Sequence, residues 1–388
     1  MAYMIAILHI ALEPTSGVWS VMKELSDAQN KSGRYQAVAI GVISSSKWPA
    51  SYSQQFDDLN LLRYQCKTPN LFGTAQFLWQ IIWPPPIAAW VDDLVNKSNA
   101  DIVVIHFHNA WLSGVFVPIR QSNSRKVKVV ATFHGISTTL KQRPVRRMLH
   151  RNMAQRLIKN GVTLTSVDAG SLPLAEELFG ISSDMFVTIP NGLASDDTLS
   201  ARRWLGKGSF VVGYIGLIAN HKGWQIIADA VLKVRASGRD VRLVIAGAGD
   251  EEKKARQMAK DHPHAMEFIG YVSSPRINVM PKIHVVALMS TYEGLPMVLI
   301  EAASIGLPAI ATSVGGVSEV IKDGVNGLLV SRSVESLADA IMSLYGNSTM
   351  VENMGKASRD IYAKNFEIKQ IIYLYDAVYS APSSLSKY

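Results

Sequence analysis

Two glutamates in the last third of the chain are spaced so that they could bind different parts of one ligand. Glu293 and Glu301 are separated by seven residues, and Gly294-Leu295-Pro296 follows the first of them. A proline suits the first position of a helix, because the N–H that it lacks would have no partner there. The run 297–303 can then be helical. This predicts Glu293 in the loop before the helix and Glu301 about a turn and a half inside it.

The start of this helix could bind phosphate. The backbone N–H groups of Leu295, Met297 and Val298 lie where a helix has no internal acceptor, so they are predicted to face phosphate oxygens. The carboxylate of Glu301, one turn deeper, suits the hydroxyls of a ribose attached to that phosphate. A capped amphipathic helix with incidental glutamates is the alternative, and composition alone favours it.

A strand-turn-helix pattern earlier in the chain could bind the same ligand. The apolar run 210–215 is followed by Gly216, and Lys222 stands at the predicted start of the next helix. A glycine at such a turn lets the backbone approach a diphosphate, and a lysine at a helix N-terminus adds positive charge. Taken alone, the pattern more often reflects a surface lysine after an ordinary turn.

The first half of the chain offers Gly17 and His134. Gly17 precedes the helical pattern 18–29 and could bring N–H groups near a phosphate or sugar oxygen. His134 follows the predicted strand 127–133, at the edge where parallel α/β sheets bind ligands. His106 and His108 end the preceding strand and are predicted near the same edge, without an assigned role. A lone histidine is more often structural, so the position of His134 carries this prediction.

The stretch 290–330 resembles the signature of glycosyltransferase family 4, retaining enzymes with the two-domain GT-B fold. It contains S-x-x-E-G-x-P-x-x-x-x-E-A at 290–302, G-x-P-x-I-A-T at 306–312, G-G-x-x-E-x-I at 315–321 and D-G-x-N-G-x-L-V at 323–330. So many matched positions in order make a chance resemblance implausible.

The resemblance implies a role for each candidate. Glu293 contacts the donor sugar near the bond that breaks, Lys222 stabilises the leaving diphosphate, and His134 orients the sugar or the acceptor. These three are the predicted catalytic residues. The predicted substrate-binding residues are Gly17, Gly216, Val272, Gly294, Leu295, Met297, Val298 and Glu301. Val272 ends a segment that meets the nucleobase in the family, although strand-end packing would explain it equally well.

One departure from the family pattern concerns charge. Leu217 stands where the family has an arginine that holds the donor diphosphate. Half of the usual positive charge is therefore missing from this motif, and His221 or another basic residue must compensate.

Neither a metal nor a cofactor is expected. The sequence has no Asp-x-Asp pair and no ligand spacing typical of a zinc or magnesium site. A lysine and a helix N-terminus are expected to stabilise the leaving group instead. Gly247-Ala248-Gly249 begins like a dinucleotide-binding fingerprint, but Glu252 replaces its third glycine. This argues against a nicotinamide or flavin site.

Short apolar runs alternate with helical patterns along the whole chain, which predicts parallel sheets built from βαβ units. The pattern restarts near residue 209. We therefore expect an α/β protein of the GT-B fold, with two Rossmann-like domains that face each other across a cleft. The expected domains are 1–192, on the acceptor side, and 205–364, which binds the nucleotide sugar. The helix 365–388 is expected to cross back to the first domain, as the family fold implies.

The net charge of +8 and the pI of 9.4 indicate an anionic partner. No nucleic-acid-binding motif is present, so a glycolipid or an anionic membrane surface is favoured, through the basic segment 142–159. A core-facing helix with a solvated basic face is the alternative. The aromatic segment 72–90 could stack on sugars, lie at a membrane interface or be buried. A single cysteine and the absence of a signal peptide predict a cytoplasmic protein, peripheral on the inner membrane at most.

The predicted function is a retaining, metal-independent transfer of a hexosyl unit from a nucleoside-diphosphate sugar to a glycan or glycolipid. UDP-sugars are favoured as donors and GDP-sugars are possible, and bacterial polysaccharide or lipopolysaccharide synthesis is the expected setting. A nucleotide-sugar epimerase or hydrolase, and an inactive glycan- or membrane-binding module, are the alternatives.

Overall fold

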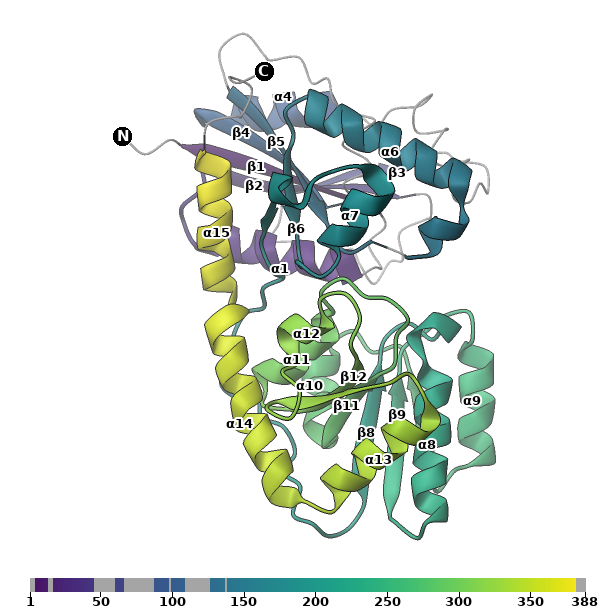
Figure 1. Cartoon of the computed structure of the whole chain (residues 1–388). Coiled ribbons are helices and arrows are strands. Elements are labelled where there is room, and N and C mark those ends of the chain that lie inside the picture. The colour runs from purple at the N-terminus through teal and green to yellow at the C-terminus, as the bar shows by residue number, and fades with distance from the viewer. Residues whose placement is uncertain are drawn as a thin grey trace. The chain divides into compact units, whose positions relative to one another are not determined.

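The structure, a computed structural model, describes residues 4–12, 17–44, 60–65, 87–97, 99–108, 126–136 and 138–381. The chain divides into two compact units. Unit 1 is Met1–Ala194 with Ile368–Tyr388, and unit 2 is Ser195–Glu367. Each unit contains one parallel sheet flanked by helices (Figure 1). The predicted α/β fold with two Rossmann-like domains is therefore confirmed. Most of the aromatic segment 72–90 lies outside the described residues.

The sheet of unit 1 has seven described strands in the order β3-β2-β1-β4-β5-β6-β7. They are β1 (Ile5–Leu12), β2 (Ala37–Ser44), β3 (Asn60–Gln65), β4 (Ile102–Phe107), β5 (Lys126–Phe133), β6 (Thr163–Ser166) and β7 (Phe186–Thr188). Its helices include α1 (Gly17–Lys31), α4 (Ile87–Lys97), α6 (Pro144–Lys159), α7 (Leu172–Phe179) and α15 (Ile368–Ser380). Strand β3 was not predicted. It lies at the sheet edge, where a strand needs little apolar sequence.

Alternating side chains of β1 cover the two faces of this sheet. Ala6, Leu8 and Ile10 belong to a core cluster with residues of α4. Ile5 and Ile7 belong to another cluster, with residues of α15. This period of two is what a strand buried on both faces requires.

The C-terminal helix α15 is fixed to unit 1 by charged groups as well as by apolar packing. The ammonium group of Lys128, a buried residue of β5, donates to the carbonyl oxygens of Val378 and Ala381. Burial lowers the pKa of Lys128. Arg34 forms an ion pair of 2.7 Å with Asp376. A cation at the last carbonyls of a helix satisfies acceptors that have no partner inside the helix.

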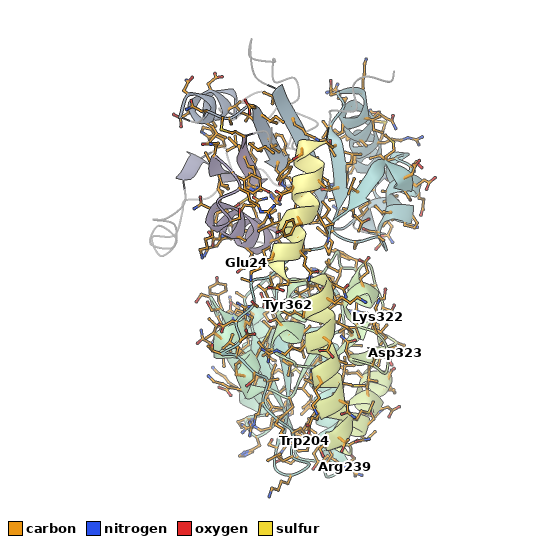
Figure 2. The ribbon with its side chains drawn as sticks, turned by 90° about the vertical axis from the view of Figure 1, so that its left-hand side faces the viewer. Glu24, Trp204, Arg239, Lys322, Asp323 and Tyr362 are labelled. Carbon is orange, nitrogen blue, oxygen red and sulfur yellow. The ribbon has the colours of Figure 1, made fainter. Side chains whose placement is uncertain are left out.

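Unit 2 has a sheet of six described strands in the order β10-β9-β8-β11-β12-β13. They are β8 (Phe210–Ile215), β9 (Val241–Ala246), β10 (Met266–Gly270), β11 (Val285–Leu288), β12 (Ala309–Thr312) and β13 (Gly327–Val330). Its helices include α8 (Trp224–Ala236), α9 (Glu252–Asp261), α10 (Pro275–Asn278), α11 (Met297–Ser304), α12 (Val317–Val320), α13 (Val334–Tyr345) and α14 (Ser348–Asn365). The ring of Trp204, labelled in Figure 2, lies in this core, 4.9 Å from the Phe210 ring between centroids.

The D-G-x-N-G segment of the sequence signature is a structural turn. Buried Asn326 accepts a hydrogen bond from the N–H of Lys322 at 2.6 Å and donates one to the carbonyl of Val320 at 2.9 Å. Asp323 accepts from the N–H of Leu329 at 2.8 Å. Figure 2 labels Lys322 and Asp323 on this turn. The polar side chains of the segment therefore satisfy backbone groups between α12 and β13.

Candidate functional site

The structure brings Lys222 and Glu293 together in unit 2. The Nζ atom of Lys222 lies 2.7 Å from Oε1 of Glu293, and the two side chains are 22% and 10% exposed. The hydroxyl of buried Ser290 donates to the same carboxylate oxygen at 2.6 Å. Lys222 ends the 3-10 turn Asn220–Lys222 after β8, whereas Glu293 lies in the loop between β11 and α11. Two residues that are 71 positions apart thus form one charged cluster.

Two glycines allow these loops to approach so closely. Gly223 has a φ of 73°, and a Cβ there would lie 2.2 Å from the carbonyl oxygen of Met289. Gly315 has a φ of 52°, and a Cβ there would lie 1.9 Å from the carbonyl oxygen of Glu293. Any side chain at either position would force the backbone apart. The cluster therefore depends on glycines that let neighbouring backbone segments pack closely.

Backbone hydrogen bonds and one arginine complete the support of these loops. The N–H of Thr291 donates to the carbonyl of His221 at 2.9 Å. Arg332 donates through Nε to the carbonyl of Met289 at 2.8 Å and through Nη2 to the carbonyl of Asn220 at 3.1 Å. Arg332 was not predicted from the sequence, because it lies two residues beyond the last matched motif, at 323–330, and belongs to none of the motifs.

Helix α11 begins one residue later than predicted. Pro296 has an extended conformation, with φ −72° and ψ 117°, and is the residue before the helix. Its fixed φ is compatible with both states, and here its carbonyl accepts from the N–H of Leu299 at 3.1 Å. Met297 and Val298 are therefore the first two helical residues, where a helix lacks internal acceptors. Glu301 is half-buried and lies about one turn further along.

The remaining predicted residues of unit 2 lie at the carboxyl edge of the same sheet. Gly216 directly follows β8 and is exposed, and Val272 follows β10 and is half-buried. Gly294 lies in the loop after β11, where its carbonyl accepts from the N–H of Gly316 at 2.9 Å. In a parallel sheet the loops after successive strands share one edge. The predicted donor residues of unit 2 therefore occupy one edge.

Leu217 and His221 bear on the missing positive charge. The side chain of Leu217 is half-exposed, and its carbonyl accepts from the hydroxyl of Tyr214 at 2.6 Å. The ring of His221 stacks on that of Tyr292, with centroids 5.2 Å apart. Burial, with the neighbouring charge of Lys222, lowers the pKa of His221. His221 is therefore a weaker source of positive charge than the arginine that the family has nearby.

His134 lies in unit 1, in a cluster of histidines at the carboxyl edge of that sheet. Its Nε2 atom is 3.2 Å from Nδ1 of His108, and Nε2 of His108 is 2.9 Å from Nδ1 of His9. His106 hydrogen-bonds to the hydroxyls of Tyr379 at 2.7 Å and Thr132 at 2.6 Å. The clustering of His106, His108 and His134 agrees with their predicted strand ends, whereas the contribution of His9 was missed.

Burial keeps these imidazoles neutral. It lowers the pKa values of His9 and His134 to about 4 and those of His106 and His108 well below the ordinary value. A neutral imidazole can donate one hydrogen bond and accept another. The cluster can therefore orient hydroxyl groups but carries no charge near neutral pH.

Gly17 is the first residue of α1 and is exposed. A Cβ at this position would meet nothing within 4 Å among the described residues. Packing against the described residues therefore does not require a glycine here, and the role of Gly17 in ligand binding stays a prediction.

The comparisons with known proteins agree with this architecture. A family model described as "Glycosyltransferase Family 4" matches residues 15–197, and one described as "Glycosyl transferases group 1" matches residues 209–347. Similar proteins include glycogen synthase from Mycobacterium tuberculosis, 24% identical over 78% of this chain and 67% of that protein. The phosphatidyl-myo-inositol mannosyltransferase of the same organism is 26% identical over 72% of this chain and 75% of that protein.

Solved structures show the same fold at lower identity. HepE from Anabaena in complex with UDP-glucose superposes with a TM-score of 0.73, at 17% identity, over 97% of this chain and 100% of that one. The lipopolysaccharide outer core galactosyltransferase WaaB superposes with a TM-score of 0.67, at 15% identity, over 97% of this chain and 99% of that one. The protein is a glycosyltransferase with a GT-B fold. The matched models and the motifs of 290–330 together place it in glycosyltransferase family 4.

Proposed function

We propose that the protein transfers a hexosyl unit, with retention of configuration and without a metal ion, from a nucleoside-diphosphate sugar to a glycan or glycolipid. The observation that carries this proposal is the cluster of Lys222, Glu293 and Ser290 in the loops before α8 and α11. It combines a cation and a carboxylate at the sheet edge where parallel α/β units bind nucleotides.

The leaving diphosphate is stabilised by Lys222 and by the start of α11. Met297 and Val298 supply N–H groups in the first turn, where the positive end of the helix dipole favours anions. Leu295 and Gly294 lie in the loop that leads into this turn. Preorganised donors of this kind stabilise charge as it develops in the transition state. In metal-dependent transferases a divalent cation provides this stabilisation of the leaving diphosphate.

The other residues position the donor and the acceptor. Glu301 binds the ribose hydroxyls, and Val272 contacts the base. Glu293 contacts the donor sugar near the bond that breaks, and His134 orients a hydroxyl of the sugar or the acceptor. The acceptor oxygen attacks the anomeric carbon on the face that the diphosphate leaves. The departing phosphate oxygen takes the acceptor proton, so no side chain has to act as a nucleophile.

UDP-sugars are the favoured donors, because HepE is described with UDP-glucose and the pneumococcal transferase GtfA with UDP and GlcNAc. GDP-sugars remain the second choice. A surface glycan or glycolipid is the favoured acceptor, as the name of WaaB suggests for that protein. Polysaccharide or lipopolysaccharide synthesis at the cytoplasmic face of the inner membrane is the setting that fits these substrates.

A thermal-shift screen against nucleoside diphosphates and their sugars tests the donor proposal. A ligand at 100 times its Kd stabilises the folded state by about 2.7 kcal/mol, which moves the transition measurably. UDP or GDP should stabilise the protein, and the matching nucleoside monophosphate should stabilise it less. Failure of every nucleoside diphosphate to bind would refute the proposed donor class.

Two alternatives make different predictions in the same preparation. An epimerase or hydrolase on this fold would convert the donor rapidly to an epimer or to free sugar without an acceptor. A binding module would hold the nucleotide without turnover, and Leu217 in the position of the family arginine favours that alternative. Product formation that depends on an added acceptor would refute both.

Helix α6 is the proposed contact with an anionic membrane surface. Its second half is held to unit 1 by buried Met153, Ala154 and Leu157, whereas Val145 is 66% and Met148 is 56% exposed in its arginine-rich first half. No helix in the described part of the chain is long and apolar enough to cross a membrane. Sedimentation with anionic vesicles should fall when Val145 and Met148 are both changed to Glu. Equal binding by that variant and by wild type would refute the contact.

A further inference from the structure

An unbroken series of hydrogen bonds leads from helix α1 to His134. The Oε1 atom of Gln29 lies 2.6 Å from Nε2 of His9. Nδ1 of His9 lies 2.9 Å from Nε2 of His108, and Nδ1 of His108 lies 3.2 Å from Nε2 of His134. Gln29, His9 and His108 are buried, while His134 is half-buried. Three elements of unit 1, α1, β1 and the end of β4, thus connect to the residue after β5.

The protons in this series are not independent of one another. Burial lowers the pKa of each of the three imidazoles, so each ring is neutral and has one N–H and one bare nitrogen. Each contact between two rings needs one donor and one acceptor. The donor and acceptor at the first contact therefore determine the donor and acceptor at every later contact.

The amide of Gln29 determines the direction of donation along the series. Its oxygen faces His9, so Nε2 of His9 must donate and Nδ1 of His9 must accept. His108 then donates through Nε2 and accepts through Nδ1. His134 must donate through Nε2, which leaves its Nδ1 as a bare acceptor. The other end of the amide, Nε2 of Gln29, has no close hydrogen-bond partner among the described residues. It faces the hydroxyl of Tyr379, whose pKa is raised by burial and lowered in part by a hydrogen bond from Gln29, and this leaves the amide oxygen for His9.

We propose that Gln29, His9 and His108 are positioning residues that fix the tautomer of His134, so that its Nδ1 accepts a hydrogen bond from a substrate hydroxyl. The role of this hydroxyl rests on the proposed function, whereas the tautomer does not. A sugar or acceptor hydroxyl must then donate to His134. A methoxy or fluoro group at the same position cannot donate and would not be held.

The same cluster is also the strongest candidate for a metal site in the described residues. Ligand atoms of His9, His106 and His108 all lie within 4.8 Å of one another. Both nitrogens of His9 and both of His106, however, already have hydrogen-bond partners. A cation would have to break these bonds, whereas neutral rings of His9 and His106 keep all of them. The geometry therefore favours the series of hydrogen bonds over a metal site.

Nitrogen-15 NMR of the full chain labelled at its nine histidines tests the tautomer directly. The signals of His134 are assigned by comparison with His134→Asn. We expect a protonated Nε2 and a bare Nδ1 in the ligand-free wild type. A protonated Nδ1 would overturn the proposal. So would a stoichiometric metal ion found by elemental analysis of the purified protein.

Gln29→Met tests whether the direction comes from α1, because it keeps the length of the side chain but removes the amide. Ser26→Ala is the control, since Ser26 is buried on the same helix and its hydroxyl donates, within the described part of the chain, to the carbonyl of Met22 at 2.8 Å. In Gln29→Met both tautomers of His134 should appear and kcat should fall about tenfold or more. The Kd for UDP should stay within about twofold, and Ser26→Ala should change none of these.

The two proposals can fail separately. An unchanged His134 spectrum in Gln29→Met would overturn the role of Gln29, even if the enzyme transfers sugar. Absence of transfer with every donor would refute the proposed function, while the spectrum of the wild type would still decide the tautomer.

Discussion

The ion pair between Lys222 and Glu293 leads to a prediction with two opposite effects. In the ligand-free protein the lysine that should bind the diphosphate is 2.7 Å from a carboxylate, and both side chains are largely buried. A bound diphosphate must compete with Glu293 for this charge and is repelled by it. Glu293→Gln keeps the shape and an oxygen for Ser290 but removes the negative charge. We therefore expect tighter binding of the nucleoside diphosphate and slower transfer.

The size of the effect follows from the geometry. A charge-assisted hydrogen bond has a net value of about 1.5–3 kcal/mol. Two unit charges about 6 Å apart interact by about 3 kcal/mol at an effective dielectric constant of 20. Glu293→Gln weakens the hydrogen bond to Lys222 and removes the repulsion of the diphosphate. Even part of either contribution should lower the Kd for UDP about tenfold, since 1.4 kcal/mol corresponds to a factor of ten. Loss of the contact with the donor sugar should lower kcat at least about tenfold.

Calorimetry with UDP measures the first effect, and steady-state kinetics with the sugar donor measures the second. Glu335→Gln is the matched control, because it removes the same charge from an exposed ion pair with Lys233 in the same unit. Exposed pairs contribute little, so its Kd should stay within about twofold of wild type. An unchanged or higher Kd for Glu293→Gln would show that the diphosphate does not compete for Lys222.

Four further outcomes test the same account. Glu301→Ala should weaken binding of UDP more than that of a simple diphosphate, as calorimetry would show, because it removes an acceptor for ribose hydroxyls. Leu217→Arg should lower the Kd for UDP about tenfold if a guanidinium reaches the phosphates; no gain would indicate that the space is already filled. Excess chelator should change the initial rate less than about twofold, and loss of activity restored by magnesium would contradict the proposed leaving-group stabilisation. Denaturant titrations should show stability falling as the pH drops from about 6.5 towards 4, by up to about 1.4 kcal/mol per pH unit for each of His9, His106 and His108, because the unfolded state gains protons that the buried rings refuse. A flat profile in that range would contradict the neutral cluster.

The sequence predicted the fold because both sheets are buried on two faces, so their strands are nearly continuous apolar runs. It missed β3, where the edge position removes that requirement. The position of Pro296 was wrong by one residue, since the ring of a proline fixes φ and leaves ψ free. The charged pair in unit 2 was predicted as two separate residues. The motif fixed the loop of Glu293, but the contact with Lys222 depends on the glycine at 223, whose necessity appears only in the packed backbone.

The residues that surround His134 show where sequence reasoning stops. Strand ends predicted that His106, His108 and His134 share one sheet edge, because parallel strands place their carboxyl ends together. The same rule gives no pairing of atoms, and His9 and Gln29 lie in an apolar strand and a helix without a motif. The feature of the sequence that could have indicated His9 is its position as a polar residue inside an otherwise apolar run, ILHIAL. Buried polar groups need partners, so such a residue predicts a network even when its members are unknown.

The two units differ in the charge that they offer to a ligand. This difference supports the proposal that unit 2 binds the nucleotide sugar while His134 of unit 1 orients a hydroxyl. The edge of unit 2 holds a cation, a carboxylate and a helix N-terminus, the groups that respond to charge on a leaving diphosphate. The described histidines at the edge of unit 1 are neutral, because burial lowers all their pKa values. Neutral donors and acceptors fix the direction of a hydroxyl without attracting the diphosphate. We infer that unit 1 orients hydroxyl groups while unit 2 stabilises the charge that develops as the glycosidic bond to the nucleotide breaks.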